Sequence, residues 1–215
     1  MLQLRGMRGK YIVIEGHDGT GKSTQVDMLR DYLNNEHHID TEEIHEPAGV
    51  PIADELRAII KNGELQRDAT TNLLLFTAAR REIYRQKIAP ALGRGAWVLA
   101  ARNWISTVAY QGYGEGLDPD KIEQITREFT DPLYLKPDKT VLLNLADESE
   151  RFNRIDQRGD LEKPDTFESR DEAFQQAVKN GYIKVAQQHS FQFIDASQMI
   201  SHVHEEIVKT IQPLL

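Results

Sequence analysis

The stretch that decides the fold is "YIVIEGHDGTGKST", residues 11–24. It begins with the apolar run expected of a buried strand and continues into a loop that alternates glycine with polar residues. Gly16, Gly21, Lys22 and Ser23 match the pattern G-x-x-x-x-G-K-[S/T] in full. The context also fits, because an amphipathic helix is predicted from Lys22 to about Asn35. We therefore predict a phosphate-binding loop between a first strand and a first helix.

The chemistry of such a loop follows from its residue types. Glycines let the backbone turn tightly and aim N–H groups at phosphate oxygens, and the helix N-terminus adds the positive end of its dipole. Lys22 would reach the β- and γ-phosphates, and the Ser23 hydroxyl would face Mg²⁺. A glycine-rich turn without a ligand is the alternative. The predicted nucleoside triphosphate site comprises Gly16, His17, Asp18, Gly19, Thr20, Gly21, Lys22, Ser23 and Thr24.

Composition narrows the class of protein. The chain has 215 residues, of which 40% are hydrophobic and 28% are charged, as in an ordinary globular protein. Its formal net charge of −8 does not favour a nucleic-acid binder, which more often carries a basic surplus. The absence of cysteine excludes disulfides and thiol chemistry. No apolar run approaches the roughly eighteen residues of a membrane span. We expect a cytoplasmic enzyme that acts on a small anionic metabolite.

Short apolar runs alternate with helical patterns along the chain. This alternation predicts an α/β protein in which right-handed crossovers build a parallel sheet with helices on both faces. The polar stretch at residues 157–166 is the best candidate for a mobile loop. The expected strands cover residues 11–16, 40–46, 96–102, 139–145 and 191–196. The expected helices cover residues 22–35, 52–63, 68–92, 105–111, 119–130, 147–158, 169–188 and 198–211.

The end of the third expected strand bears on the reaction. Phosphate loops serve GTPase switches, ATPase motors and small-molecule kinases alike. The guanine-reading pattern N-K-x-D of GTPases is absent from the sequence. Arg102 stands at the carboxyl end of the strand "AWVLAAR", and in an open α/β sheet that end faces the ligand crevice. It suits a second substrate that carries a phosphate, although a surface arginine capping the strand is also compatible.

Several further segments resemble the bacterial thymidylate kinases, nucleoside monophosphate kinases that phosphorylate dTMP with ATP. The resemblance spans nearly the whole chain, and the second and third of the following segments are the most specific. The segments are "HEPAGVPIADELRAII", "LLLFTAARRE", "ARNWISTVAYQG" and "KPDKTVLLNL". The resemblance implies a single P-loop kinase domain over residues 1–215, with a three-layer fold, a five-stranded parallel sheet and a small lid at about 150–168. It also implies ATP and dTMP as substrates, Mg²⁺ as the metal and a homodimer.

The resemblance assigns roles at the acceptor site. It places Phe76 against the thymine ring and Arg80 at a base carbonyl, and helical spacing puts both on one face. Without the resemblance, helical spacing favours a core phenylalanine and a surface arginine that belongs to an ion pair. Tyr110 matches the tyrosine that packs on the sugar, and Asp18 an acidic residue near the sugar and acceptor phosphate. The implied dTMP site comprises Asp18, Glu46, Pro47, Arg57, Phe76, Arg80, Arg102, Ser106, Thr107, Tyr110 and Gln111.

The resemblance also implies where the catalytic cations come from. Family members supply a transition-state arginine from the phosphate loop or from the lid. The loop here has none, whereas the lid region carries Arg151, Arg154 and Arg158. We therefore expect Lys22, Arg102, Arg154 and Arg158 to be catalytic. A solvated charged helix face is the alternative for the lid arginines.

Two positions depart from the family pattern. Ala101 stands where the family usually has an aspartate near Mg²⁺, and His45 stands where it has an arginine. Glu15 and Asp18 are the candidates for part of the missing acidic role, and Ser23 and Asp18 are the expected metal-side residues. Because of Ala101, a paralogue that binds nucleotides with little turnover stays open. A kinase for another monophosphate or for a deoxynucleoside also stays open.

Overall fold

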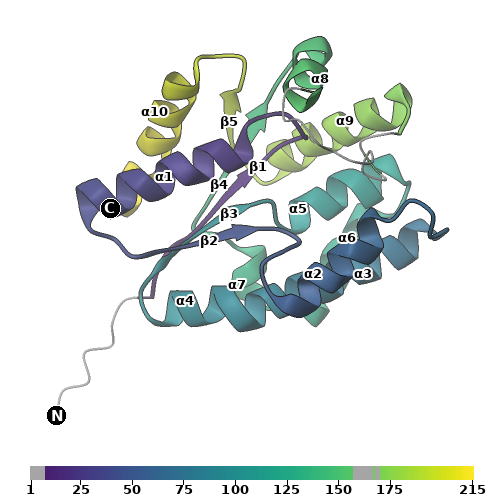
Figure 1. Ribbon diagram of the computed structural model, residues 1–215, viewed down its shortest axis with the longest axis horizontal. Coiled ribbons are helices and arrows are strands. Elements are labelled where there is room, and N and C mark those ends of the chain that lie inside the picture. Colours follow the sequence, from purple (N-terminus) through teal and green to yellow (C-terminus); the bar gives the residue numbers. More distant parts are fainter. Residues whose placement is uncertain (1–7, 157–166, 168–169) are drawn as a thin grey trace.

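The computed structural model describes residues 8–156, 167 and 170–215. Its centre is a five-stranded sheet in which every neighbouring pair is parallel, with the order β2-β3-β1-β4-β5 (Figure 1). The strands are β1 (Tyr11–Glu15), β2 (Thr41–His45), β3 (Trp97–Ala101), β4 (Lys139–Asn144) and β5 (Gln192–Asp195). The predicted fold class, a parallel sheet flanked by helices, is confirmed.

Helices cover both faces of the sheet and make three layers (Figure 1). One face packs against α1 (Lys22–His37) and α10 (Ile200–Ile211). The other face packs against most of the remaining helices. These include α2 (Pro51–Lys61), α3 (Ala69–Ile83), α5 (Trp104–Thr107), α6 (Pro119–Phe129), α7 (Pro132–Leu135) and α9 (Glu172–Gln188). Helix α8 (Glu148–Asp156) follows β4, and a short 3₁₀ turn (Gln212–Leu214) follows α10.

The residues of β1 show how the sequence builds two cores. Successive side chains of a strand point to opposite faces of its sheet. Tyr11 and Val13 therefore join the core beneath α2, α3 and α9, whereas Ile12 and Ile14 join the core beneath α1 and α10. All five residues of β1 are buried. An unbroken apolar run is what a strand covered on both faces requires.

The sheet order fixes where a ligand can bind. The chain runs outward from β1 to β2, returns through β3, and then continues on the other side of β1 with β4 and β5. The order therefore reverses beside β1, and the crevice at the carboxyl ends of the strands opens there. The loop 16–21, between β1 and α1, lies at this point.

The predicted helices are present, with differences at three places. Residues 68–92 were expected to form one helix ending near Pro90, but α3 is followed by a π-helical turn (Tyr84–Ile88) and then by α4 (Ala89–Gly93). The Ala89 N–H donates to the Tyr84 carbonyl five residues back, which lets helical structure continue through Pro90. A second π-helical turn (Val108–Gly114) extends α5, and the short α7 was not expected.

Among the described residues, no helix has both the length and the apolar character needed to cross a bilayer.

Candidate active site

The loop between β1 and α1 has the backbone of a phosphate cradle. Gly16, Gly19 and Gly21 have φ values of 148°, 87° and 89°, a region that side chains disfavour. A Cβ on Gly16 would lie 2.5 Å from the Leu143 carbonyl oxygen. The Lys22 ammonium donates to the His17 carbonyl at 2.8 Å and so lies across the loop. Ser23 and Thr24 are exposed in the first turn of α1, where their hydroxyls are accessible to a ligand.

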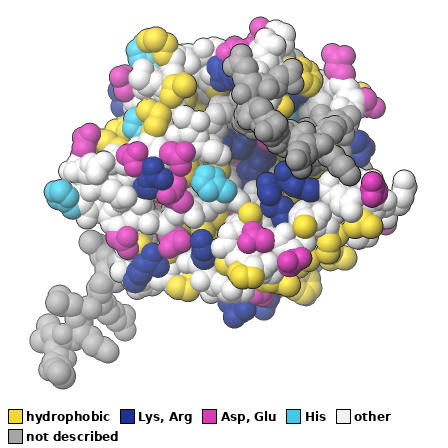
Figure 2. Space-filling view, in the orientation of Figure 1, with side chains coloured by type: hydrophobic (Ala, Val, Ile, Leu, Met, Phe, Trp, Pro, Cys, Tyr) yellow, Lys and Arg dark blue, Asp and Glu magenta, His cyan; other side chains and the backbone are white. Residues whose placement is uncertain are grey.

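A cavity of about 170 Å³ opens beside this loop. Lys and Arg side chains gather around a hollow in the middle of the face shown in Figure 2. Three cations border the cavity, which therefore suits a phosphorylated ligand. The lining residues are Asp18, Lys22, Ser23, His45, Glu46, Arg57, Ala101 and Arg102.

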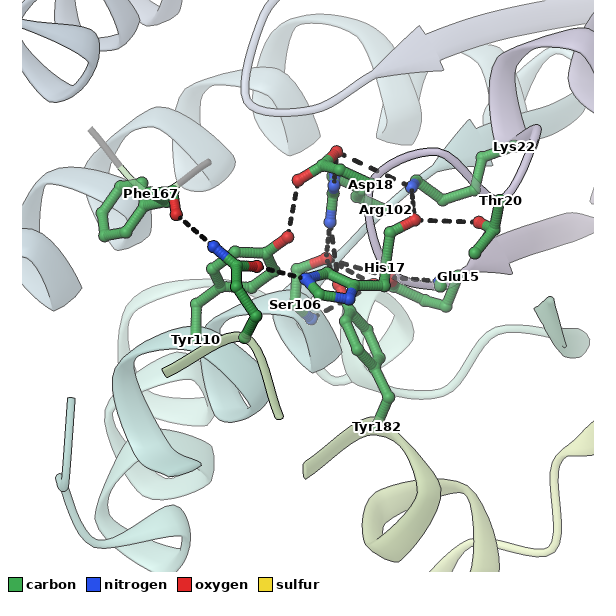
Figure 3. A network of polar contacts seen from close by, with 12 residues as sticks. Glu15, His17, Asp18, Thr20, Lys22, Arg102, Ser106, Tyr110, Phe167 and Tyr182 are labelled. Atoms are coloured by element: carbon green, nitrogen blue, oxygen red, sulfur yellow. Dashed lines mark hydrogen bonds and ion pairs between the residues drawn. The ribbon is translucent and has the colours of Figure 1, made fainter. Parts of the chain in front are cut away.

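Arg102 is held in place from several sides. Its backbone adopts φ 74°, which is unfavourable for a residue with a side chain and marks local strain. One guanidinium nitrogen donates to Asp18, and the other donates to the Tyr182 hydroxyl at 2.8 Å and the Ser106 hydroxyl at 3.0 Å (Figure 3). The guanidinium carbon lies 5.5 Å from the centroid of the Tyr110 ring. This arginine is thus fixed before any ligand binds.

Asp18 is the acidic partner in this arrangement. It accepts a hydrogen bond from the Tyr110 hydroxyl at 2.6 Å, and the Lys22 ammonium lies 4.0 Å away. Burial favours the neutral carboxyl, but Arg102 and Lys22 outweigh it and hold the pKa of Asp18 well below its usual range. The carboxylate is therefore ionised and already engaged with Arg102 and Tyr110.

Glu15 organises the turn after β3. The side chain is fully buried and accepts from the backbone N–H groups of Asn103 at 2.7 Å and Ser106 at 3.2 Å. The Ser106 hydroxyl donates to the same carboxylate at 2.9 Å. Glu15 does not border the cavity. Glu15 and Asp18 were the candidates for the role of the aspartate that is missing at position 101. The Glu15 carboxylate is already occupied by these backbone N–H groups.

Phe76 and Arg80 lie one turn apart on α3, as their spacing predicts. The Arg80 guanidinium carbon is 5.0 Å from the centroid of the Phe76 ring. Arg80 is buried; it donates to Glu46 at 2.8 Å and also to the Thr107 hydroxyl. Burial raises the pKa of Glu46 to about 7, although Arg80 and the Tyr134 hydroxyl, 2.7 Å away, oppose the rise. The expected base-reading pair thus has a rigid support.

Other expected acceptor residues lie around this pair. Pro47 is half-buried directly after Glu46, and Arg57 reaches the cavity from α2. Gln111 is buried, and its side-chain amide donates to Glu115 at 3.1 Å. Asn72, one turn before Phe76 on α3, donates to Glu115 at 3.0 Å. Gln111 is therefore held in a polar cluster with Glu115 and Asn72, near the N-terminus of α3.

Three aromatic residues that sequence patterns do not mark lie close to the expected acceptor residues. Phe167 is buried, and its ring centroid lies 6.0 Å from that of Phe76 and 5.9 Å from that of Tyr110. Phe174 stacks on Phe167, with centroids 6.4 Å apart, and Tyr182 reaches Arg102 from the same helix, α9. The apolar periodicity of α9 gives only a core signal, and nothing in the sequence separates these residues from ordinary packing.

His17 is buried within the loop, and its Nε2 lies 2.9 Å from the side-chain oxygen of Gln175 on α9 (Figure 3). Burial lowers the pKa of His17 to about 4, and the positive charge of Arg151 adds to the effect. The imidazole is therefore neutral near neutral pH. Gln175, like Tyr182, was not identified from the sequence, because no motif links residues so far apart.

The expected lid arginines are placed differently from one another. Arg154 on α8 donates to the Ala196 carbonyl at 3.0 Å and pairs with Glu150, and it does not border the cavity. Arg151 is buried, and a Cβ on Gly19 would lie 2.9 Å from its Cγ. Helix α8 therefore packs directly on the phosphate loop. Arg158 lies outside the described residues.

Several known proteins are similar to this chain over almost its whole length. The family model described as thymidylate kinase matches residues 14–207. A thymidylate kinase of Exiguobacterium sibiricum is 37% identical over 208 residues, covering 95% of each chain. One from Teredinibacter turnerae is 37% identical over 212 residues, covering 97% of this chain and 100% of the relative. The crystal structure of thymidylate kinase from Ehrlichia chaffeensis matches with a TM-score of 0.73 and 27% identity, covering 95% of this chain and 99% of that one. The chain belongs to the thymidylate kinase family of nucleoside monophosphate kinases.

Proposed function

We propose that the protein transfers the γ-phosphoryl group of ATP to the 5′-phosphate of dTMP and releases ADP and dTDP. One observation carries the proposal. A single cavity is bordered by the phosphate loop with Lys22 and by Arg102, and Glu46 in its wall holds Arg80 beside Phe76. Donor phosphates and an acceptor that carries a pyrimidine can therefore meet end to end.

The donor side of the cavity is the cradle of residues 16–24. Its backbone N–H groups and Lys22 would neutralise the β- and γ-phosphates. A magnesium ion fits the donor set on this side, because the Ser23 hydroxyl is exposed in the first turn of α1. Ser23 would hold it together with phosphate oxygens, and Asp18 supplies a carboxylate on the same cavity wall. The ion would neutralise charge on the phosphates during transfer.

The acceptor side uses a ring and a planar donor fork, which suit a pyrimidine face and its carbonyl edge. Phe76 would stack on thymine, and Arg80 would donate to a base oxygen. Arg102 and Arg57 would hold the 5′-phosphate. Ser106 supports Arg102 and Thr107 supports Arg80, each by accepting a hydrogen bond from the guanidinium. Tyr110 and Asp18 would pack against the sugar. The rigid supports of Arg80 and Arg102 keep both donors aimed without ligand.

The reaction needs charge compensation more than base catalysis. An acceptor phosphate oxygen forms a bond to the γ-phosphorus while the bond to the β-bridging oxygen breaks. The nucleophile is already anionic, so no strong base has to remove a proton. Lys22 and Arg102 offset the repulsion between the two anions and the charge on the moving phosphoryl group.

We further propose that the lid arginines Arg154 and Arg158 act in the transition state, when α8 and the segment to about residue 168 close over the donor. Closure would exclude water and suppress ATP hydrolysis. The protein would act as a cytoplasmic homodimer without nucleic-acid or membrane partners. Exposed apolar side chains on α2 and α3, among them Ile52, Ile59 and Leu74, support a dimer, which light scattering would test.

A coupled assay for ADP with a panel of nucleoside monophosphates tests the proposal. We expect dTMP to be turned over fastest. Replacing Phe76 with alanine should raise the KM for dTMP by about tenfold or more, since stacking of a base contributes about 1–3 kcal/mol. Thr70→Ala, at an exposed polar position of the same helix, should leave the KM for dTMP unchanged. Rapid turnover of another monophosphate, or of thymidine itself, would reassign the substrate. Tight binding of both nucleotides without turnover would indicate a nucleotide-binding paralogue.

A further inference from the structure

Gln175 joins two parts of the site that are far apart in the sequence. The residue is buried on α9, and its side-chain oxygen lies 2.9 Å from Nε2 of His17 in the phosphate loop. Its side-chain nitrogen donates to the backbone carbonyl of Phe167 at 2.8 Å (Figure 3). One amide group therefore contacts the phosphate loop with one atom and, with the other, Phe167, whose ring lies beside Phe76 at the proposed base pocket.

The directions of these hydrogen bonds are fixed. Because the Gln175 nitrogen is the donor to a carbonyl, the oxygen of the same amide must be the atom that faces His17. An oxygen can only accept, so Nε2 of His17 carries the proton. A neutral imidazole supplies that donor. The bridge thus requires an amide at position 175, since neither a carboxylate nor an apolar side chain can both accept from His17 and donate to Phe167.

Both ends of the bridge contact residues assigned to nucleotides. At one end, His17 is flanked in the loop by Gly16 and Asp18, and its carbonyl accepts from Lys22. At the other, the ring of Phe167 lies 6.0 Å from that of Phe76. Tyr110 links the two ends a second time: its ring is 6.0 Å from His17 and 5.9 Å from Phe167. A base that packs against Phe76 therefore constrains the group that holds the loop.

We propose that Gln175 is a positioning residue that couples the two nucleotide sites, so that dTMP in the base pocket strengthens ATP binding at the loop. The proposal rests on the function proposed above. A bound base orders Phe167, and Gln175 transmits that order to His17 and the loop backbone. ATP then binds a phosphate loop that is already ordered, so its binding loses less conformational entropy. This is positive cooperativity without a large structural change. By linkage, ATP strengthens dTMP binding by the same factor.

Isothermal titration of the full chain tests the coupling. A non-hydrolysable ATP analogue with Mg²⁺ is titrated with and without saturating dTMP, and the order is then reversed. In the wild type we expect dTMP to tighten analogue binding by at least about fivefold. In Gln175→Met, which has similar length but no amide, we expect a factor below about two. Gln176→Met is the matched control, because the Gln176 side chain is next in sequence but exposed. This variant should keep the wild-type coupling factor.

A second variant keeps the test decisive if Gln175→Met does not fold. Gln175→Glu retains an acceptor for His17 but cannot donate to the Phe167 carbonyl, so its coupling should fall as well. A purely structural role would lower stability or both separate affinities and leave the coupling factor at its wild-type value. That result in either variant, or a wild-type factor of one, overturns the proposal. A wild type that fails to bind dTMP at all would instead refute the proposed function.

Discussion

His45 and Ala101 are register partners at the carboxyl ends of the neighbouring strands β2 and β3. Both border the cavity beside Lys22 and Arg102. The family pattern places an arginine at the first of these positions and an aspartate at the second. The two departures are therefore a single local change, in which adjacent residues of opposite charge are both replaced. The cations that remain on the cavity wall are supplied by other elements.

The role of Ala101 can be tested by restoring the carboxylate. Ala101→Asp should increase the affinity of the nucleotide complex for Mg²⁺ by about tenfold, because it adds an anionic oxygen ligand or a partner for metal-bound water. Titration of Mg²⁺ against bound ATP analogue measures this without turnover. Ala101→Asn has the same shape without the charge and should change the affinity little. Equal affinities in the two variants would remove position 101 from the metal environment.

Two buried groups should give stability opposite dependences on pH. The pKa of Glu46 is raised to about 7, so its contribution to stability is present below the unfolded value near 4.5 and is lost as pH rises through 7. The pKa of His17 is lowered to about 4, so its contribution is present above the unfolded value near 6.5 and is lost as pH falls toward 4. Each amounts to about 3 kcal/mol, and in the wild type the two largely cancel.

Single variants separate these contributions. In Glu46→Gln the contribution of His17 remains, so the free energy of unfolding should rise with pH between about 4.5 and 7. In His17→Phe the contribution of Glu46 remains, and the free energy should fall over the same interval. Urea denaturation at several pH values measures both slopes. Slopes of the same sign in the two variants would contradict the assigned protonation states.

The contact between the phosphate loop and α8 can be isolated with two glycines. Gly19 and Gly21 have nearly equal φ values of 87° and 89°. A Cβ on Gly19 would lie 2.9 Å from both Cγ and the carbonyl oxygen of Arg151, whereas a Cβ on Gly21 would meet no atom within 4 Å. Both alanine variants introduce similar backbone strain, but only Gly19→Ala displaces α8. We expect Gly19→Ala to be less stable than Gly21→Ala by about 1–3 kcal/mol in urea denaturation, and equal losses would exclude the contact.

The lid arginines should act on turnover rather than on acceptor binding. Arg154→Ala and Arg158→Ala should each lower kcat by about tenfold or more, with little change in dTMP affinity, because their contacts would form mainly in the transition state. Steady-state kinetics combined with dTMP titration separates the two quantities. A variant with unchanged kcat would leave that arginine in a surface role, as the Arg154 contacts with Ala196 and Glu150 would then suffice to explain it.

Local sequence signals were enough to predict the sheet and the donor loop. The buried run before Gly16, the glycine spacing and the lysine are all local, and each strand carries its own apolar pattern. The π-helical turn at Tyr84–Ile88 was not predicted. A proline at position 90 normally indicates the end of a helix, unless the backbone hydrogen bonds before it shift from four to five residues apart. The short α7 has too few residues for a periodic pattern.

The residues that hold the candidate site residues in place could not be predicted from the sequence. Phe76, Arg80 and Tyr110 were proposed as site residues because their segments resemble those of a family. Gln175 and Tyr182 lie on α9 among apolar residues at helical spacing, and their polar partners are on the phosphate loop and after β3. Such pairings depend on how α9 crosses the sheet, which is a property of tertiary packing. Glu15 was considered as a metal-side residue, but its carboxylate holds the backbone N–H groups of Asn103 and Ser106.

Helix α9 sets the spacing between its contact with the phosphate loop and its contact with Arg102. Gln175 reaches the phosphate loop and Tyr182 reaches Arg102 from two points on one face of the helix. With a rise of about 1.5 Å per residue, these points are about 10 Å apart along a rigid axis. One residue inserted between them would turn one point about 100° away from the other, so the length of this helical segment is as constrained as the identity of its side chains.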